Sequence, residues 1–133
     1  MRRTMCFALM TVLAVAWLGR GTPQAKADNA YRVEFVAKYV KADSSDSKDK
    51  AFAAAVDKAK CAICHEGKNK KNRNNYGNAL AELLNRKTDA ENKEKIQAAL
   101  KKVESKRSDP KNDKSPTFGD LIKAGKLPFA PKG

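Results

Sequence analysis

The feature that most constrains this chain is the pentapeptide Cys61-Ala62-Ile63-Cys64-His65. It matches C-x-x-C-H, the attachment signature of c-type haem. In that chemistry each thiol adds across one vinyl group of a porphyrin, and two intervening residues let both sulfurs reach one macrocycle. The next residue then lies under the ring, where its imidazole binds the iron. His65 is the single histidine of the chain. The pattern therefore predicts Cys61 and Cys64 as haem-binding residues and His65 as the iron ligand.

Three alternatives to haem attachment are compatible with the motif. It could be a chance Cys-x-x-Cys beside an unrelated histidine, or it could form a local disulfide. It could also serve a thiol oxidoreductase, but that chemistry favours a Cys-x-x-Cys within a βαβ setting. The rest of this chain has the periodicity of helices and no strand pattern that stands out. Haem attachment is favoured because the remaining features of the sequence agree with it.

The N-terminal segment has the pattern of a secretory signal peptide. Arg2 and Arg3 form a positive start, residues 5–18 are apolar, and Ala25-Lys26-Ala27 is an A-x-A cleavage site. The apolar run is short for a membrane span. We therefore expect residues 1–27 to be removed before Asp28, with a retained N-terminal anchor as the alternative. Such a signal predicts a periplasmic or secreted protein.

Cleavage would leave residues 28–133 as one small domain of 106 residues. Only two of the three cysteines would persist, and both belong to the motif. A secreted chain of this size often needs disulfides or a prosthetic group, because its own core is small. No disulfide framework is left here, so a covalent haem c would supply the missing apolar surface.

The chain carries an excess of basic residues, with a formal net charge of +13. The predicted signal peptide holds four basic residues and no acidic one, so the remainder keeps +9. A positive surface steers a protein toward acidic partners and raises the association rate. We therefore expect a redox partner protein with an acidic docking surface; a lysine-rich face that only aids solubility is the alternative. Nucleic acid is not expected, because aromatic residues are few and do not alternate with the basic ones. No membrane span is expected after cleavage.

Apolar periodicity predicts an all-α fold of about four to five short helices. In the first of them Tyr31, Phe35 and Tyr39 recur every four residues, although local alternation there would also suit a strand. Residues 66–75 and 105–115 are polar and are predicted as loops. The helices are expected at residues 28–41, 48–60, 76–84, 88–105 and 116–125.

Residues typical of helix ends support these boundaries. Asn74 or Asn75 can cap the third helix. Thr88 and Glu91 form a T-x-x-E capping box for the fourth helix. Thr117 and Gly125 are expected to cap and to stop the last one.

These features together resemble a small monohaem cytochrome c of class I. The resemblance rests on the export signal, the helix that leads into C-x-x-C-H, the early position of that motif, and the later helices. It is strict over residues 61–65 and loose over residues 48–125, where the domain core is expected. The resemblance implies a cytochrome c-like bundle around one covalent haem. It also implies electron transfer in the periplasm, with Cys61 and Cys64 as thioether cysteines and His65 as proximal ligand, and no enzyme activity.

The chain departs from class I at the far side of the iron, where that family usually places a methionine. All three methionines lie within residues 1–27, and there is no second histidine. The far side could be open, bound by water, or closed by Lys, Tyr or Asn. Tyr76, Lys70 and Lys71 are the nearest candidates in sequence. The vacant position raises a second possible function, a haem-based sensor or binder of a small ligand. A peroxidase-like enzyme is disfavoured because no distal histidine is available for proton transfer.

Overall fold

The computed structural model describes residues 23–129, and describes side chains from residue 30 onward. This part of the chain is helical and contains no β-strand, so the all-α prediction is confirmed for it. It forms six α-helices and one 3-10 helix, rather than four to five helices. They are α1 (Pro23–Tyr39), α2 (Ser47–Ala59), η1 (Lys60–Ile63), α3 (Asn75–Ala81), α4 (Arg86–Asp89), α5 (Lys93–Val103) and α6 (Phe118–Lys123).

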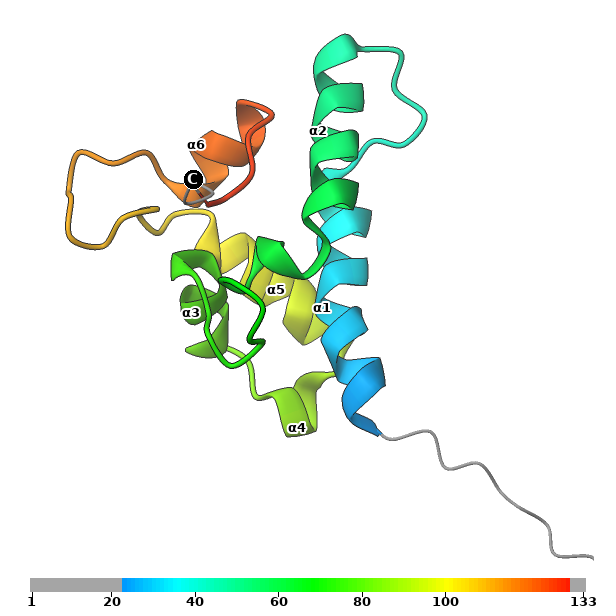
Figure 1. Cartoon of the computed structure of the whole chain (residues 1–133), viewed down its shortest axis with the longest axis vertical. Helices are drawn as coiled ribbons and strands as arrows, with labels where there is room; N and C mark the ends of the chain where they lie inside the picture. Colours follow the sequence, from blue (N-terminus) through cyan, green and yellow to red (C-terminus); the bar gives the residue numbers. More distant parts are fainter. Residues whose placement is uncertain (1–22, 130–133) are drawn as a thin grey trace, which may run out of the picture.

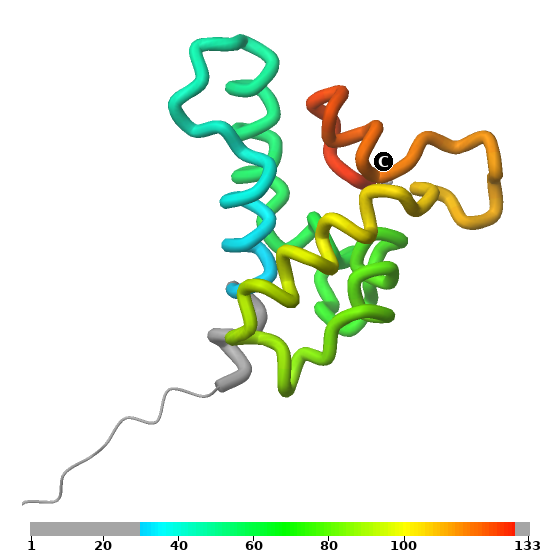
Figure 2. Tube along the Cα trace, turned by 180° about the vertical axis from the view of Figure 1, so that it is seen from behind, coloured from blue at the N-terminus to red at the C-terminus, as the bar shows by residue number. Residues whose placement is uncertain are grey.

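The helices lie around α5. Helices α1 and α2 run along one side of the molecule and are joined by the loop at residues 40–46 (Figure 1). Helices α3 and α6 lie on the other side, with α5 between them and the α1–α2 pair, and α4 lies at the lower end of the molecule in this view. Seen from behind, α5 crosses α1 (Figure 2), and these two helices pack directly against each other. This crossing brings residues from both halves of the chain into one core.

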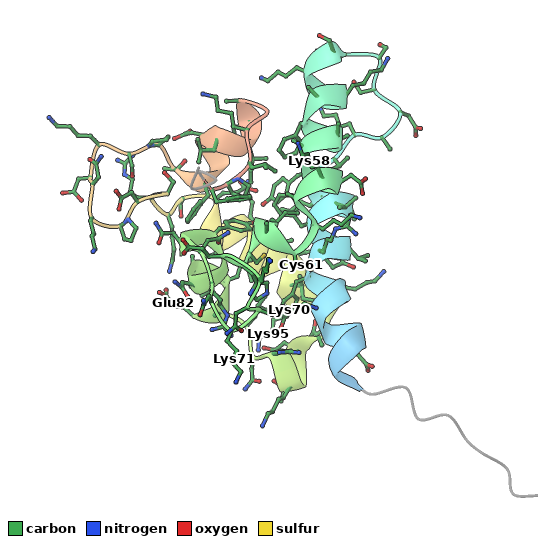
Figure 3. The ribbon with its side chains drawn as sticks, viewed as in Figure 1. Lys58, Cys61, Lys70, Lys71, Glu82 and Lys95 are labelled. Carbon is green, nitrogen blue, oxygen red and sulfur yellow. The ribbon has the colours of Figure 1, made fainter. Side chains whose placement is uncertain are left out.

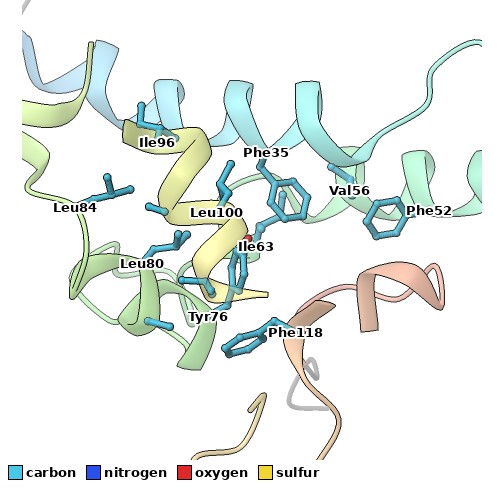
Figure 4. Packing of buried hydrophobic residues seen from close by; sticks show 13 residues of the cluster. Phe35, Phe52, Val56, Ile63, Tyr76, Leu80, Leu84, Ile96, Leu100 and Phe118 are labelled. Atoms are coloured by element: carbon cyan, nitrogen blue, oxygen red, sulfur yellow. The ribbon is translucent and has the colours of Figure 1, made fainter. Parts of the chain in front are cut away.

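Aromatic rings form the centre of that core (Figure 4). Phe35 on α1, Tyr76 on α3 and Phe118 on α6 are each 1% exposed. The ring of Tyr76 stands edge-on to both others, with centroid distances of 5.9 Å to Phe35 and 5.1 Å to Phe118. Such edge-to-face contacts are favoured by the ring quadrupoles. One buried row on α5 completes the core with Ile96, Leu100 and Val103.

Several helix predictions are confirmed, and their end signals act as expected. Helix α2 buries Phe52 and Val56, the two large apolar residues of its predicted face. The side chain of Thr117 accepts a hydrogen bond from the Asp120 N–H, and the Asp120 carboxylate accepts one from the Thr117 N–H, so α6 begins with a full capping box. Gly125 ends this segment with φ of +72°, a conformation that favours glycine.

Other boundaries differ from the predictions. Helix α1 extends to Pro23, and the alternative of a strand there is wrong. The predicted capping box at Thr88 is wrong as well, because Thr88 lies inside the separate short helix α4. Helix α5 begins at Lys93 instead, where the Asn92 side chain accepts a hydrogen bond from the Lys95 N–H. Asparagine is at least as good an N-cap as threonine, and in this structure Asn92, not Thr88, is the N-cap of α5.

The predicted signal peptide lies outside the described residues except for its last five, which belong to α1. Within residues 23–129 no helix is both long enough and apolar enough to cross a membrane. The predicted loop at residues 105–115 is confirmed as non-helical. It is nevertheless held in place, because the Arg107 guanidinium donates to the Ser115 carbonyl at 2.8 Å and Ser115 is buried.

Candidate functional site

The motif sits at a sharp turn between two helices. Helix α2 ends at Ala59, and Lys60 turns the chain with φ of +47°, a value that L-residues rarely adopt. The 3-10 helix η1 then carries Cys61, and its Ile63 is buried in the core. The N–H groups of Cys64 and His65 both donate to the Cys61 carbonyl, at 3.2 and 3.0 Å. The five residues therefore form one compact turn that presents its side chains together.

Asn74, the N-cap of α3, fixes this turn from outside. Its side-chain amide donates to the carbonyls of Ala62 and Ile63, both at 3.0 Å. Its N–H donates to the Cys64 carbonyl at 3.1 Å, and its side-chain oxygen accepts from the Gly77 N–H at 2.8 Å. One residue thus caps a helix and holds three carbonyls of the motif.

Gly77 lets α3 come close to the motif. A Cβ atom at this position would lie 2.0 Å from the Cys64 carbonyl oxygen, which is too close for any side chain. Glycine is required here by the neighbouring backbone and not by a positive φ. The contact seats the first turn of α3 directly on the Cys-x-x-Cys-His segment.

We expect Asn74→Asp to destabilise the protein although aspartate is an equally good N-cap. The carboxylate keeps the acceptor for Gly77 but lacks the two donors to Ala62 and Ile63. Loss of these hydrogen bonds should lower the free energy of unfolding by about 1–3 kcal/mol. Denaturant unfolding of the intact exported protein measures this.

Asn78→Asp provides a control with the same change of charge, at an exposed position of the same helix. It should change the free energy of unfolding by less than about 0.5 kcal/mol. An Asn74→Asp variant as stable as the Asn78→Asp variant would show that the amide does not hold the motif.

The motif opens on a cavity of about 740 Å³ that has all three predicted site residues, Cys61, Cys64 and His65, in its wall. The wall also includes residues from α1, α3, α4 and α5. Figure 3 shows Cys61, Lys70 and Lys95 facing this region from different segments of the chain. The volume falls within the range of about 300–1,000 Å³ usual for cofactor sites. Its apolar part is formed by Phe35, Ile63, Leu80, Leu83, Leu84 and Leu100.

The polar part of the wall is strongly basic. Seven basic side chains line the cavity against two acidic ones. Asp89 is paired with Lys95 at 2.7 Å, and Glu82 is paired with Lys106. Hydrogen bonds from Lys95 and the Asn85 N–H lower the pKa of Asp89, so this carboxylate stays charged and engaged at neutral pH. This excess of positive charge suits an occupant with anionic groups. The basic residues are Arg32, Lys60, Lys70, Arg73, Arg86, Lys87 and Lys95.

The two cysteines differ in their surroundings. Cys61 is exposed and Cys64 is half-buried, and neither forms a disulfide. Burial, with a smaller contribution from Cys61, raises the pKa of the Cys64 thiol to about 12. Both thiols of the motif are therefore free in the structure, the first at the surface and the second largely enclosed.

His65 lines the cavity with an imidazole whose Nδ1 atom is buried and makes no hydrogen bond. A buried polar atom without a hydrogen-bond partner is unusual in a folded protein. Within residues 23–129, no three His, Cys, Asp or Glu side chains converge on one point that could hold a bare metal ion. The described residues thus bring two thiols and one imidazole to the wall of one cavity.

The three candidates for the far side of such a group are not equivalent. Lys70 lines the cavity. Lys71 is exposed and lies outside the lining residues. Tyr76 lies outside the cavity wall, because its ring packs in the core between Phe35 and Phe118.

Three residues of this site were not predicted from the sequence. Asn74 has a local signal only as a helix cap, and Gly77 has none at all. The loop between Cys64 and Asn74 is irregular, so the sequence between them has no pattern that predicts the hydrogen bonds of Asn74 to the motif. Tyr31 belongs to a row of aromatic residues on one helix. The spacing of such residues shows which face of the helix is apolar, but not whether a given residue packs in the core or lines a cavity.

Comparison with known proteins gives no match: no family model, no curated protein and no solved structure resembles this chain closely enough to be assigned.

Proposed function

We propose that this protein is a c-type cytochrome that binds haem covalently and transfers electrons. One observation carries the proposal: Cys61, Cys64 and His65 line the same cofactor-sized cavity. The sequence motif alone places these three residues near one another and does not require a cavity in front of them. The space of about 740 Å³ in front of them, with an apolar surface on the adjoining helices, is independent support.

The side chains around this cavity have complementary tasks in the proposal. Cys61 and Cys64 would form the thioether bonds, and His65 would bind the iron. The apolar residues of α1, α3 and α5 would cover the porphyrin faces, and the basic residues of the wall would pair with the two propionates. The bound haem would supply a one-electron Fe(III)/Fe(II) couple, whose potential depends on axial ligation and burial.

Exposure of the motif supports electron transfer to another protein. Cys61 is exposed, so the attachment edge of the cofactor would lie near the surface. Lys60, Lys70 and Arg73 line the cavity beside the motif. The proposed partner is a redox protein with an acidic docking face, because opposite charges steer encounter. With the predicted signal peptide, we propose that this function belongs to the periplasm or to the outside of the cell.

A second candidate is a haem-based binder of small ligands. Among the described residues that line the cavity, His65 is the sole histidine and there is no methionine. This composition favours the second candidate. The far side of the iron would then lack the two side chains that most often close it in cytochromes. An accessible iron position would permit ligand binding in addition to electron transfer.

Spectroscopy of the exported protein tests the proposal. We expect a reversible one-electron reduction with c-type haem bands and without the far-red methionine–iron band. We also expect a midpoint potential below that of methionine-ligated relatives, because the thioether ligand is missing. Rapid CO binding by the reduced form would favour the ligand binder, whereas no CO binding would favour a simple carrier. A methionine-type spectrum, or no haem spectrum, would contradict the proposed site.

A further inference from the structure

Lys60 has a backbone conformation that residues with a side chain rarely adopt. Within the part of the chain that the structure describes, three residues have a positive φ, and two of them, Gly67 and Gly125, are glycines. The third is Lys60, with φ of +47° and ψ of −114°. A residue with a Cβ atom is strained in this region, and such strain is found most often at functional sites. The strain at Lys60 therefore needs an explanation in what its side chain does.

The end of α2 does not require a lysine at this position. The Lys60 N–H donates to the Val56 carbonyl and closes the last turn of α2, a bond that glycine would make equally well. The Lys60 side chain is exposed and has no hydrogen bond or ion pair among the described residues. Lys58 already places a positive charge in the last turn of the same helix, without this strain. Neither helix capping nor solubility thus accounts for a strained lysine.

The position of Lys60 connects it with the proposed haem. Lys60 lines the cavity and is joined directly to Cys61, the first of the two thiols that would carry the cofactor. A covalent bond at Cys61 would keep the attached edge of the haem within one residue of Lys60, whichever way the rest of the ring lies in the cavity. A positive charge near a redox centre favours the form that holds the extra electron, and its effect falls with distance and with salt.

We propose that Lys60 tunes the redox equilibrium of the haem: its strained turn holds a positive charge beside the attachment site, where the charge stabilises the reduced iron. This inference rests on the proposed covalent haem and adds the residue that adjusts the Fe(III)/Fe(II) equilibrium. Glycine would relax the turn but would carry no charge, so the chain loses backbone stability at this position to keep the charge there. Strain and charge are separate properties of one residue, and different substitutions remove them.

Three substitutions separate the two properties in the haem-loaded protein. Lys60→Ala removes the charge and keeps the Cβ atom. It should shift the Fe(III)/Fe(II) equilibrium about twofold toward Fe(III) at low ionic strength, the factor for one charge at roughly 10 Å in a medium as polar as water. Lys60→Gly should give the same shift and also raise the folding equilibrium constant about fivefold, because it relieves the strain. Lys60→Arg should leave both quantities at the wild-type values. Potentiometry and denaturant unfolding measure them.

Lys102→Ala is the matched control. It removes an exposed positive charge from the last turn of α5, outside the cavity wall. It should leave the redox equilibrium and the folding equilibrium constant unchanged. At an ionic strength of about 1 M, where the Debye length is about 3 Å, the twofold shift of Lys60→Ala should disappear.

The inference fails if Lys60→Ala has the redox equilibrium of wild type, or if Lys102→Ala shifts it equally, because the charge at Lys60 would then have no special effect on the haem. It also fails if the shift persists at high salt or appears in Lys60→Arg, since the cause would not be charge. A Lys60→Gly variant no more stable than Lys60→Ala would show that the turn is not strained. A haemochrome assay on the same samples separates these results from failure of the proposed function: absence of covalent haem would overturn both, whereas any of the other results with covalent haem present would overturn the inference alone.

Discussion

Replacing Cys61 and Cys64 together with alanine is expected to abolish covalent haem. Each thiol would supply one of two thioether bonds, so either single replacement should leave a one-bond product in lower yield. Without both sulfurs the cofactor could be held only by His65 and by packing, which denaturation destroys. Haem staining after denaturing electrophoresis measures the difference, with wild type and the two single variants beside the double variant.

Cys6→Ala is the matched control for this experiment. Cys6 is the third cysteine of the chain and lies in the predicted signal peptide. Its replacement should leave the stained band at wild-type intensity. A stained band that survives the double replacement, or that disappears with Cys6→Ala, would refute the assignment of the motif.

Protein made without haem is expected to be largely unfolded. The described core consists of thirteen buried hydrophobic residues, and two of them, Ala79 and Ala99, contribute little apolar surface. A cavity of about 740 Å³ adjoins that core and is walled by some of the same residues, Phe35, Ile63 and Leu80 among them. Small domains of this kind are marginally stable on their own. A cofactor that binds only the folded chain adds its binding free energy to stability.

Far-UV circular dichroism of haem-free and haem-loaded chains tests this dependence. The haem-free chain should lose most of the helix signal at room temperature, and the loaded chain should melt cooperatively. Native-like helix content with a cooperative transition in the haem-free chain would contradict the expectation. In that case the apolar core alone would be sufficient for folding.

Much of the helical framework was predictable from local signals. Phe52 and Val56 mark the buried face of α2 by their spacing, and Asn74 and Thr117 occupy N-cap positions that their side chains fill in the structure. An N-cap hydrogen bond joins residues within one helical turn, so it can be predicted without knowledge of the tertiary packing. The predicted start of α5 failed because two adequate caps, Thr88 and Asn92, lie close together in the sequence, and only packing decides between them.

The site itself was predictable in its chemistry and not in its surroundings. Five consecutive residues define the thiols and the imidazole. The cavity in front of them depends on α1 crossing α5, and on Gly77 admitting α3 to the motif. These are contacts between residues distant in sequence, and no local period encodes them. Tyr31 and Tyr76 illustrate the limit: both are aromatic helix residues, yet one lines the cavity and the other fills the core.

The most direct test of the proposed haem site is the reduced pyridine haemochrome spectrum of the exported protein, combined with its intact mass. We predict a c-type spectrum, in which both vinyl groups are saturated, at one haem per chain. We also predict the mass of residues 28–133 plus one haem. A spectrum of unmodified haem, or a mass without the cofactor, would contradict the central claim that Cys61 and Cys64 hold a covalent haem with His65 on the iron.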